Sequence, residues 1–145
     1  MRHRLYLDNC AFNRPYDDQT AMKIRLEAEA KTFIQAGILR GKYELAWSYI
    51  LDYEISFNPD DERRRQIMKW KKIAAADINF STDNFAVAVE IMQRHKIKAK
   101  DALHLACALA ARCDYFITTD GGLLRKSIDG LGVVNPFYFV SEMEV

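Results

Sequence analysis

The chain has 145 residues, of which 50% are hydrophobic and 28% are charged, and its formal net charge is +1. This length suits one compact domain with a sizeable core and is short for two, so a single domain over residues 1–145 is expected. The near-neutral charge excludes nucleic-acid binding driven by bulk charge, and no apolar run reaches the roughly 18 residues that a membrane span needs.

Apolar runs alternate with helical patterns along the first half of the chain. Residues 5–7 form a short apolar run that ends at Asp8, which is typical of a strand buried on both faces. The residues that can cap the helices are Asp17 or Asp18, Ser48, and Asp60 or Asp61. The elements predicted for this half are strands at 5–7 and 43–47 and helices at 24–39, 48–57 and 60–73.

The second half continues the alternation with shorter strands. Ser81 or Thr82 can start a helix, and Asp101 begins the most apolar helix of the chain. The predicted elements are strands at 78–80 and 115–118, helices from 81 or 82 to 92, at 102–110 and at 123–127, and extended pieces at 133–134 and 137–140. Strands that alternate with helices predict an α/β fold, a three-layer sandwich around a central parallel sheet of four or five strands.

Four acidic residues fall where such a fold places its functional sites, beyond the carboxyl ends of the strands. Asp8 follows the first strand, and Asp120 follows the strand at 115–118. Asp101 starts the apolar helix, while Glu54 lies among apolar residues of the helix at 48–57. Two unpaired carboxylates about 5 Å apart repel by roughly 3 kcal/mol, so four that converge require either a cation or protonation of some of them. Ligands that are oxygen atoms alone suit Mg²⁺ or Mn²⁺.

Each acid also has a purely structural interpretation. Asp101 can be a helix N-cap, and Asp120 can be a turn residue. Glu54 can be an ordinary surface residue of its helix, and Asp8 can cap the turn after its strand. Asp52 is a rival for Glu54, because both lie on the same predicted helix.

The order and spacing of these acids, with the residues around them, match a known family. The matching segments are 6–9, Ser48 with Glu54 six residues later, 100–106, 116–120 with Leu123-Leu124 after it, and 134–136. On these segments the chain resembles the PIN-domain nucleases and, within them, the VapC-type toxins of prokaryotic toxin–antitoxin pairs. The segment 10–15 is similar to one branch of PIN proteins, in which an Asn-Arg-Pro sequence also occurs.

The resemblance implies a metal-dependent endoribonuclease that hydrolyses RNA phosphodiester bonds, leaving a 5′-phosphate and a 3′-hydroxyl. The four acids would be the catalytic and metal-binding residues, with Mg²⁺ or Mn²⁺ as cofactor. Thr118 would position a ligand or water, and Asn9 would support the site. The implied partners are an RNA substrate and the cognate antitoxin of a type II pair, and many family members form homodimers. The alternative is a non-catalytic PIN-like module that binds RNA or protein.

Basic residues cluster at 63–65, 69–72 and 94–100. These clusters could hold RNA phosphates beside the acidic groove, or they could be solvated helix faces. His104 lies within the apolar helix that Asp101 starts. It is interpreted as a hydrogen-bonded, partly buried side chain and not as a metal ligand or general base.

The three cysteines exclude two further classes of protein. The chain has an odd number of cysteines and no Cys-x-x-Cys pair, because they lie at Cys10, Cys107 and Cys113. This argues against a disulfide framework and against a zinc ribbon. Cys107 lies in an apolar stretch and is interpreted as a small core residue. The apolar part of the N-terminus is too short for a signal peptide, so a cytoplasmic protein without membrane attachment is expected.

Overall fold

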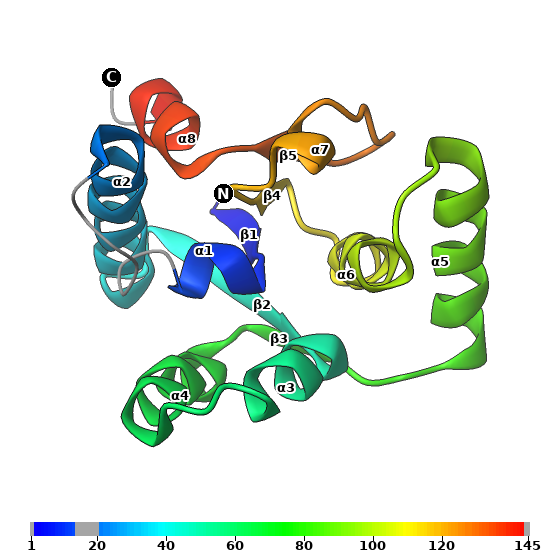
Figure 1. Ribbon diagram of the computed structural model, residues 1–145, viewed down its shortest axis with the longest axis horizontal. Coiled ribbons are helices and arrows are strands. Elements are labelled where there is room, and N and C mark those ends of the chain that lie inside the picture. The colour runs from blue at the N-terminus through cyan, green and yellow to red at the C-terminus, as the bar shows by residue number, and fades with distance from the viewer. Residues whose placement is uncertain (1, 14–20, 144–145) are drawn as a thin grey trace.

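The computed structural model describes residues 2–13 and 21–143 (Figure 1). The predicted caps Asp17 and Asp18 lie outside these ranges, as does the end of the 10–15 segment. Within the described ranges, five strands form one sheet in the order β3-β2-β1-β4-β5, and every neighbouring pair is parallel. The strands are β1 (His3–Leu7), β2 (Tyr43–Ser48), β3 (Ala76–Ile78), β4 (Tyr115–Ile117) and β5 (Gly132–Val134). The predicted α/β fold with a parallel sheet is therefore confirmed.

Helices cover both sides of this sheet. They are α1 (Asn9–Asn13), α2 (Met22–Leu39), α3 (Tyr49–Ser56), α4 (Asp61–Met68), α5 (Thr82–His95), α6 (Ala99–Ala110), α7 (Gly121–Leu124) and α8 (Pro136–Met143), with a 3₁₀ helix at Lys69–Ile73. In Figure 1, α2 and α8 pack together on one side of the strands, and α5 and α6 pack together on the other. None of the helices in the described ranges is both long and apolar enough to cross a membrane.

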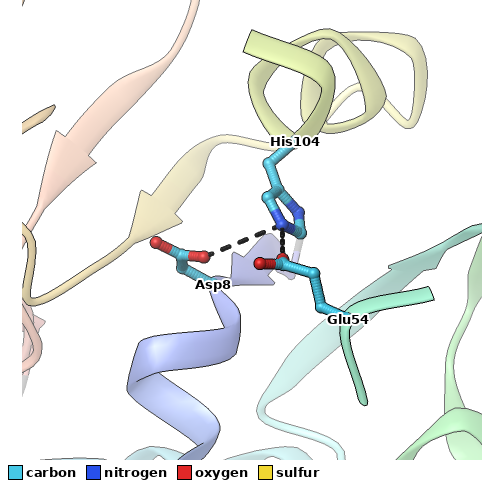
Figure 2. Close-up of side chains that lie close together, drawn as sticks. All are labelled: Asp8, Glu54 and His104. Atoms are coloured by element: carbon cyan, nitrogen blue, oxygen red, sulfur yellow. Dashed lines mark hydrogen bonds and ion pairs between the residues drawn. The ribbon is translucent and has the colours of Figure 1, made fainter. Parts of the chain in front are cut away.

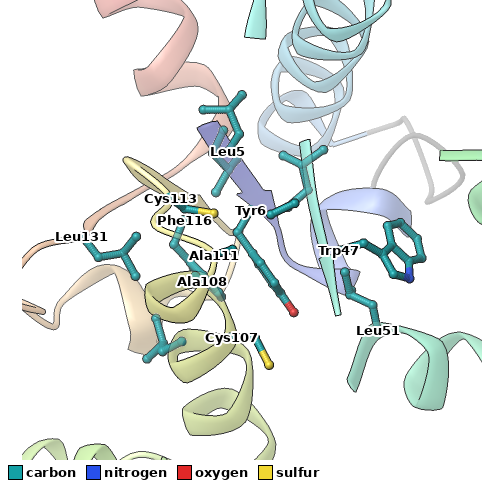
Figure 3. Close-up of a cluster of buried hydrophobic side chains, with 14 of the residues drawn as sticks. Leu5, Tyr6, Trp47, Leu51, Cys107, Ala108, Ala111, Cys113, Phe116 and Leu131 are labelled. Carbon is teal, nitrogen blue, oxygen red and sulfur yellow. The ribbon is translucent and has the colours of Figure 1, made fainter. Parts of the chain in front are cut away.

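Large side chains from the central strands fill the core between the two helical layers (Figure 3). Tyr6 on β1, Trp47 on β2 and Phe116 on β4 are each 0% exposed. The rings of Tyr6 and Phe116 stack with centroids 5.3 Å apart, so β1 and β4 are joined by side chains as well as by backbone. Cys107 of α6 is also 0% exposed, as predicted for a core residue. This packing fixes the strands at the centre of the sheet, where the acids follow them.

Polar side chains start three of the helices as the sequence predicts. Ser48 accepts a hydrogen bond from the N–H of Leu51, Asp60 from that of Arg63, and Ser81 from that of Asn84. Each bond satisfies a backbone donor that the first turn of a helix leaves without a partner.

The prediction of an extended piece at 137–140 is wrong, because these residues form part of α8. Asn135 precedes the helix, and its Oδ1 accepts a hydrogen bond from the Tyr138 N–H at 2.8 Å. Pro136 then occupies the first helical position, which suits its fixed φ and its missing N–H. Phe139 is 1% exposed and packs edge-on against Tyr43 and Tyr115, so burial of this aromatic ring holds the helix in place.

Two other predicted elements are shifted along the chain, and a third is divided into two helices. The strand predicted at 78–80 is β3 at Ala76–Ile78, because pairing with β2 begins where Ala76 lies opposite Ala46. The helix predicted over 60–73 is α4 followed by a 3₁₀ helix. The short helix predicted at 123–127 is α7 at Gly121–Leu124, which starts directly after its cap.

Candidate active site

The carboxyl ends of β1 and β4 lie side by side at the centre of the sheet, with Leu7 opposite Ile117. The chain order along the sheet reverses between these two strands, which is where open α/β sheets hold their ligands. A cavity of about 330 Å³ lies at this edge. It is lined by Asp8, Asn9, Cys10, Glu54, Asp101, Thr119 and Asp120. All four acids singled out in the sequence therefore meet around one cavity.

Asp8 is held rigidly at the floor of the cavity and is only 6% exposed. Its backbone N–H donates to the carbonyl of Ile117 at 3.0 Å, which continues the pairing of β1 with β4. Its Oδ2 accepts hydrogen bonds from Thr118 Oγ1 at 2.8 Å and from Cys10 Sγ at 3.3 Å. Thr118 Oγ1 also accepts from the Asp120 N–H at 3.1 Å, so one buried hydroxyl connects both acids.

Glu54 enters the cavity from α3 and contacts His104 of α6 (Figure 2). The Glu54 Oε1 and His104 Nε2 atoms are hydrogen-bonded, and His104 Nε2 lies 4.0 Å from Asp8 Oδ1. The other ring nitrogen, Nδ1, is 2.6 Å from the Tyr6 hydroxyl, which is in turn 2.6 Å from Ser48 Oγ. Burial, followed by the nearby Cys107, holds the pKa of Tyr6 well above its usual value, so Tyr6 keeps its proton. A hydrogen-bonded chain thus runs from the core to the Glu54 carboxylate.

The choice between Glu54 and Asp52 is decided by their partners. The Asp52 Oδ1 atom accepts a hydrogen bond from Trp47 Nε1 at 2.9 Å, and its Oδ2 accepts one from Lys71 Nζ at 3.0 Å. Both oxygens of Asp52 are therefore engaged away from the cavity, and Asp52 does not line it. The Glu54 side chain is 17% exposed and does line it, so the interpretation of Glu54 as an ordinary surface residue is wrong.

Asp101 is the third residue of α6, and the N-cap position belongs to Lys98. The alternative interpretation of Asp101 as a helix N-cap is therefore wrong. Burial raises the pKa of the Asp101 carboxyl, and the negative charges of Asp8, Asp120 and Glu54 raise it further, while His104 lowers it. The shift therefore combines burial of the carboxyl, its largest cause, with repulsion from the neighbouring carboxylates.

Asp120 combines two tasks. Its Oδ1 atom caps α7 by accepting hydrogen bonds from the N–H groups of Gly122 at 2.8 Å and Leu123 at 3.3 Å. Asp120 thus has a structural role, as a helix cap and not as the turn residue that the sequence suggested. This role does not exclude a second one, because the same side chain lines the acidic cavity.

A sequence model of the PIN domain matches residues 5–128 of the chain. The chain belongs to the PIN domain family. Among solved structures, this PIN domain is similar to a toxin–antitoxin complex from Klebsiella pneumoniae, with a TM-score of 0.60 and 23% identity over 92% of this chain and 97% of the other. It is also similar to VapBC2 from Rickettsia felis bound to a DNA fragment from their promoter, with a TM-score of 0.58 and 16% identity over 91% of this chain and 98% of the other. At these identities the likeness establishes a shared fold. No curated protein matches the sequence.

The donor atoms at the cavity of this PIN domain suit a divalent cation. One ligand atom each from Asp8, Glu54 and His104 lie within 4.8 Å of one another, close enough to share an ion. Carboxylate oxygens such as those of Asp8 and Glu54 are the ligands that Mg²⁺ and Mn²⁺ prefer. After burial, repulsion from neighbouring carboxylates contributes to the raised pKa of Asp101, and a cation would relieve that repulsion.

His104 and Cys10 belong to the site, although the sequence did not assign them to it. His104 is 1% exposed and hydrogen-bonded, as interpreted, but its partner is one of the four acids. Its position three residues after Asp101 was an available signal, since residues three apart share a face of a helix. Cys10 lies two residues after Asp8 and contacts both Asp8 and Thr118, so its proximity in sequence was the corresponding signal.

Proposed function

We propose that this PIN domain is a metal-dependent endoribonuclease of the VapC type, which hydrolyses RNA phosphodiester bonds with Mg²⁺ or Mn²⁺. The observation that carries the proposal is the cavity lined by Asp8, Glu54, Asp101 and Asp120, four acids from separate segments of the chain. These four acids would hold the ion and carry the reaction, with Asn9 and Thr118 in support. When bound, the ion supplies positive charge to the phosphate and acidifies a water molecule.

The residues of the chain would divide the remaining work. Asp8 and Asp101 would orient the attacking water, while Glu54 and Asp120 would complete the ligand set or carry protons. Thr118 would keep the Asp8 carboxylate in one orientation through its 2.8 Å hydrogen bond. Side chains held this firmly need little reorganisation during the reaction, which favours catalysis.

The biological setting is proposed from the similar structures. One is described as a toxin–antitoxin complex and the other as VapBC2, which supports an antitoxin protein as the partner of this chain. A type II toxin of this kind would act on RNA in the cytoplasm, and a homodimer would agree with many members of the family. We also propose that residues 1–145 form one PIN-like domain, since the matched region 5–128 spans most of the chain.

A cleavage assay with matched variants tests the proposal. Purified protein with Mn²⁺ should cut single-stranded RNA, and EDTA should stop it. Glu54→Gln and Asp8→Asn should each reduce the rate by roughly 100-fold or more, because each removes a carboxylate that would hold the charge-stabilising ion. Asp52→Asn is the control for Glu54→Gln, since Asp52 lies on the same helix but outside the cavity.

Two outcomes would contradict the proposal. Equal cleavage by the wild type and by Asp8→Asn would mean that the acids are not catalytic. RNA binding that ignores divalent metal, survives loss of the acids and leads to no cleavage would favour the alternative of a non-catalytic binding module.

A further inference from the structure

A second pocket adjoins the acidic cavity. Its volume is about 270 Å³, and it shares Asp101 and Asp120 with the acidic cavity. The pocket is also lined by Lys96 and Lys98, from the connection between α5 and α6, and by Lys126, which follows α7. The acidic cavity and the lysine-lined pocket are therefore neighbours that share two carboxylates.

Several basic residues in the described ranges pair with a carboxylate, and the three pocket lysines are not among them. In residues 2–13 and 21–143, none of the three has a carboxylate within ion-pair distance. By contrast, Arg64 pairs with Asp61, and Arg65 pairs with Glu62 on α4. The basic cluster on α4 is therefore largely neutralised by its own helix. The pocket lysines keep their charge for another ligand.

The ligand that fits this pocket is an anion that also reaches the acidic cavity. An anion alone would be repelled by Asp101 and Asp120, and this repulsion falls once a divalent cation neutralises the acids. RNA meets both conditions, because each phosphate is followed by another a few ångströms along the strand. A phosphate at the cation would place a neighbouring phosphate near the lysines.

We propose that Lys96, Lys98 and Lys126 bind the RNA phosphate adjacent to the one that is cleaved, on one side of the cleavage site only. This inference rests on the proposed function, because it needs a phosphate at the acidic cavity. The lysine pocket lies toward α6 and α7, so it gives the strand a fixed direction across the site. A substrate must then extend at least one phosphate beyond the cleaved bond on that side.

Removing the charge from single phosphates tests this inference. The substrates are short RNAs with one cleavage site, in which a neutral methylphosphonate replaces the neighbouring phosphate on the 5′ side or on the 3′ side. Wild-type protein should show a KM increase of about tenfold, equivalent to about 1.4 kcal/mol, for one of the two replacements and little change for the other. The combined variant Lys96→Gln, Lys98→Gln and Lys126→Gln should have a raised KM that neither replacement raises further.

The control variant removes the same number of positive charges from the opposite edge of the sheet. Arg40, Lys42 and Arg112 are exposed and precede the amino ends of β2 and β4, far along the strands from the cavity. Their combined replacement by Gln should leave the response to both methylphosphonates as in the wild type. An effect of equal size in the control variant, or no methylphosphonate effect in the wild type, would overturn the pocket assignment.

A binding measurement separates failure of this inference from failure of the proposed function. The slope of log Kd against log salt, measured with RNA by fluorescence anisotropy, should decrease by about one in the pocket variant and remain unchanged in the control variant. If that pattern appears without any cleavage, the nuclease proposal fails and the phosphate pocket stands. If RNA is cleaved but both variants keep the wild-type slope, the pocket fails and the nuclease proposal stands.

Discussion

Lys31 on α2 is a charged residue with a 0% exposed side chain. Its Nζ atom lies 4.5 Å from the centre of the Phe12 ring and 5.8 Å from that of Trp70. With its amide turned to accept, Gln35 takes a hydrogen bond from the same Nζ at 2.8 Å. Burial lowers the pKa of Lys31 from 10.5 to about 7, because the uncharged amine is easier to bury than the ammonium ion.

Titration of Lys31 should therefore make the free energy of unfolding depend on pH. Between pH 7 and 10.5 the unfolded chain binds more protons than the folded chain, so the free energy of unfolding rises with pH across that window. Lys31→Met removes the titrating group. We expect the variant to be more stable than the wild type at pH 6, by roughly 1–5 kcal/mol, and this gain to shrink toward pH 10.

Urea denaturation at several pH values measures the effect. Lys23→Met is the matched control, because Lys23 is exposed on the same helix and its replacement should leave the pH dependence unchanged. A Lys31→Met variant that is less stable than the wild type at pH 6 would show that the buried amine is stabilising, contrary to this argument.

At the scale of elements, α8 shows how one buried ring can hold a helix whose position the sequence pattern did not predict. Phe139 is 1% exposed and packs against rings that begin β2 and β4, whereas Phe137 on the same helix is 51% exposed. The helix also packs against α2, so it closes that side of the sheet. The contribution of α8 to the free energy of unfolding should therefore come mainly from the buried face of the helix, which carries Phe139.

Replacing the two phenylalanines separately tests this. Phe139→Ala should lower the free energy of unfolding by about 3–5 kcal/mol, since it removes a buried aromatic ring and leaves a cavity. Phe137→Ala should change it by less than about 1 kcal/mol, because the ring is already half exposed to water. Chemical denaturation of both variants provides the measurement. Equal losses would contradict the placement of α8.

For the molecule as a whole, the acidic cavity links function to stability. Asp8, Glu54, Asp101 and Asp120 come from four segments that only the folded chain brings together. Folding therefore creates a site of repelling charges, and the raised pKa of Asp101 is one measure of the cost. At pH values above 3.8, the usual pKa of an aspartate, the folded chain holds the Asp101 proton more tightly than the unfolded chain does. Ionisation of Asp101 with rising pH thus destabilises the metal-free protein.

Metal should reverse this cost. Mn²⁺ at 100 times its Kd should raise the free energy of unfolding of the wild type by about 2.7 kcal/mol, because it binds the folded state alone. Asp101→Asn should be at least as stable as the wild type in EDTA at pH 7, and it should lose most of the gain from Mn²⁺. Thermal unfolding with and without metal measures both effects.

Asp129→Asn is the control for this experiment, since Asp129 is exposed and does not line the cavity. It should keep the full response to Mn²⁺. A metal-free Asp101→Asn variant that is clearly less stable than the wild type would instead indicate a structural role for Asp101.

Local patterns in the sequence predicted β1, β2 and β4 and the caps Ser48, Asp60 and Ser81, because buried strands and helix starts depend mainly on nearby residues. The same patterns predicted that the four acids lie at one edge of the sheet, since the carboxyl ends of parallel strands meet at a common edge. The end of the chain was harder to predict. An apolar run at 137–140 fits a strand or a helix equally well, and contacts with β2 and β4 decide between them.

The sequence by itself determined the α/β class, the strands that end beside Asp8 and Asp120, and the apolar helix at Asp101, because these follow from local periodicity and order along the chain. Only the tertiary structure decided that Glu54 and not Asp52 enters the cavity, and that His104 joins it. It also brought Lys126 beside Lys96 and Lys98. These outcomes depend on contacts between residues far apart in the chain, whose geometry is set by the packing of α3, α6 and α7 around the sheet and not by any local pattern.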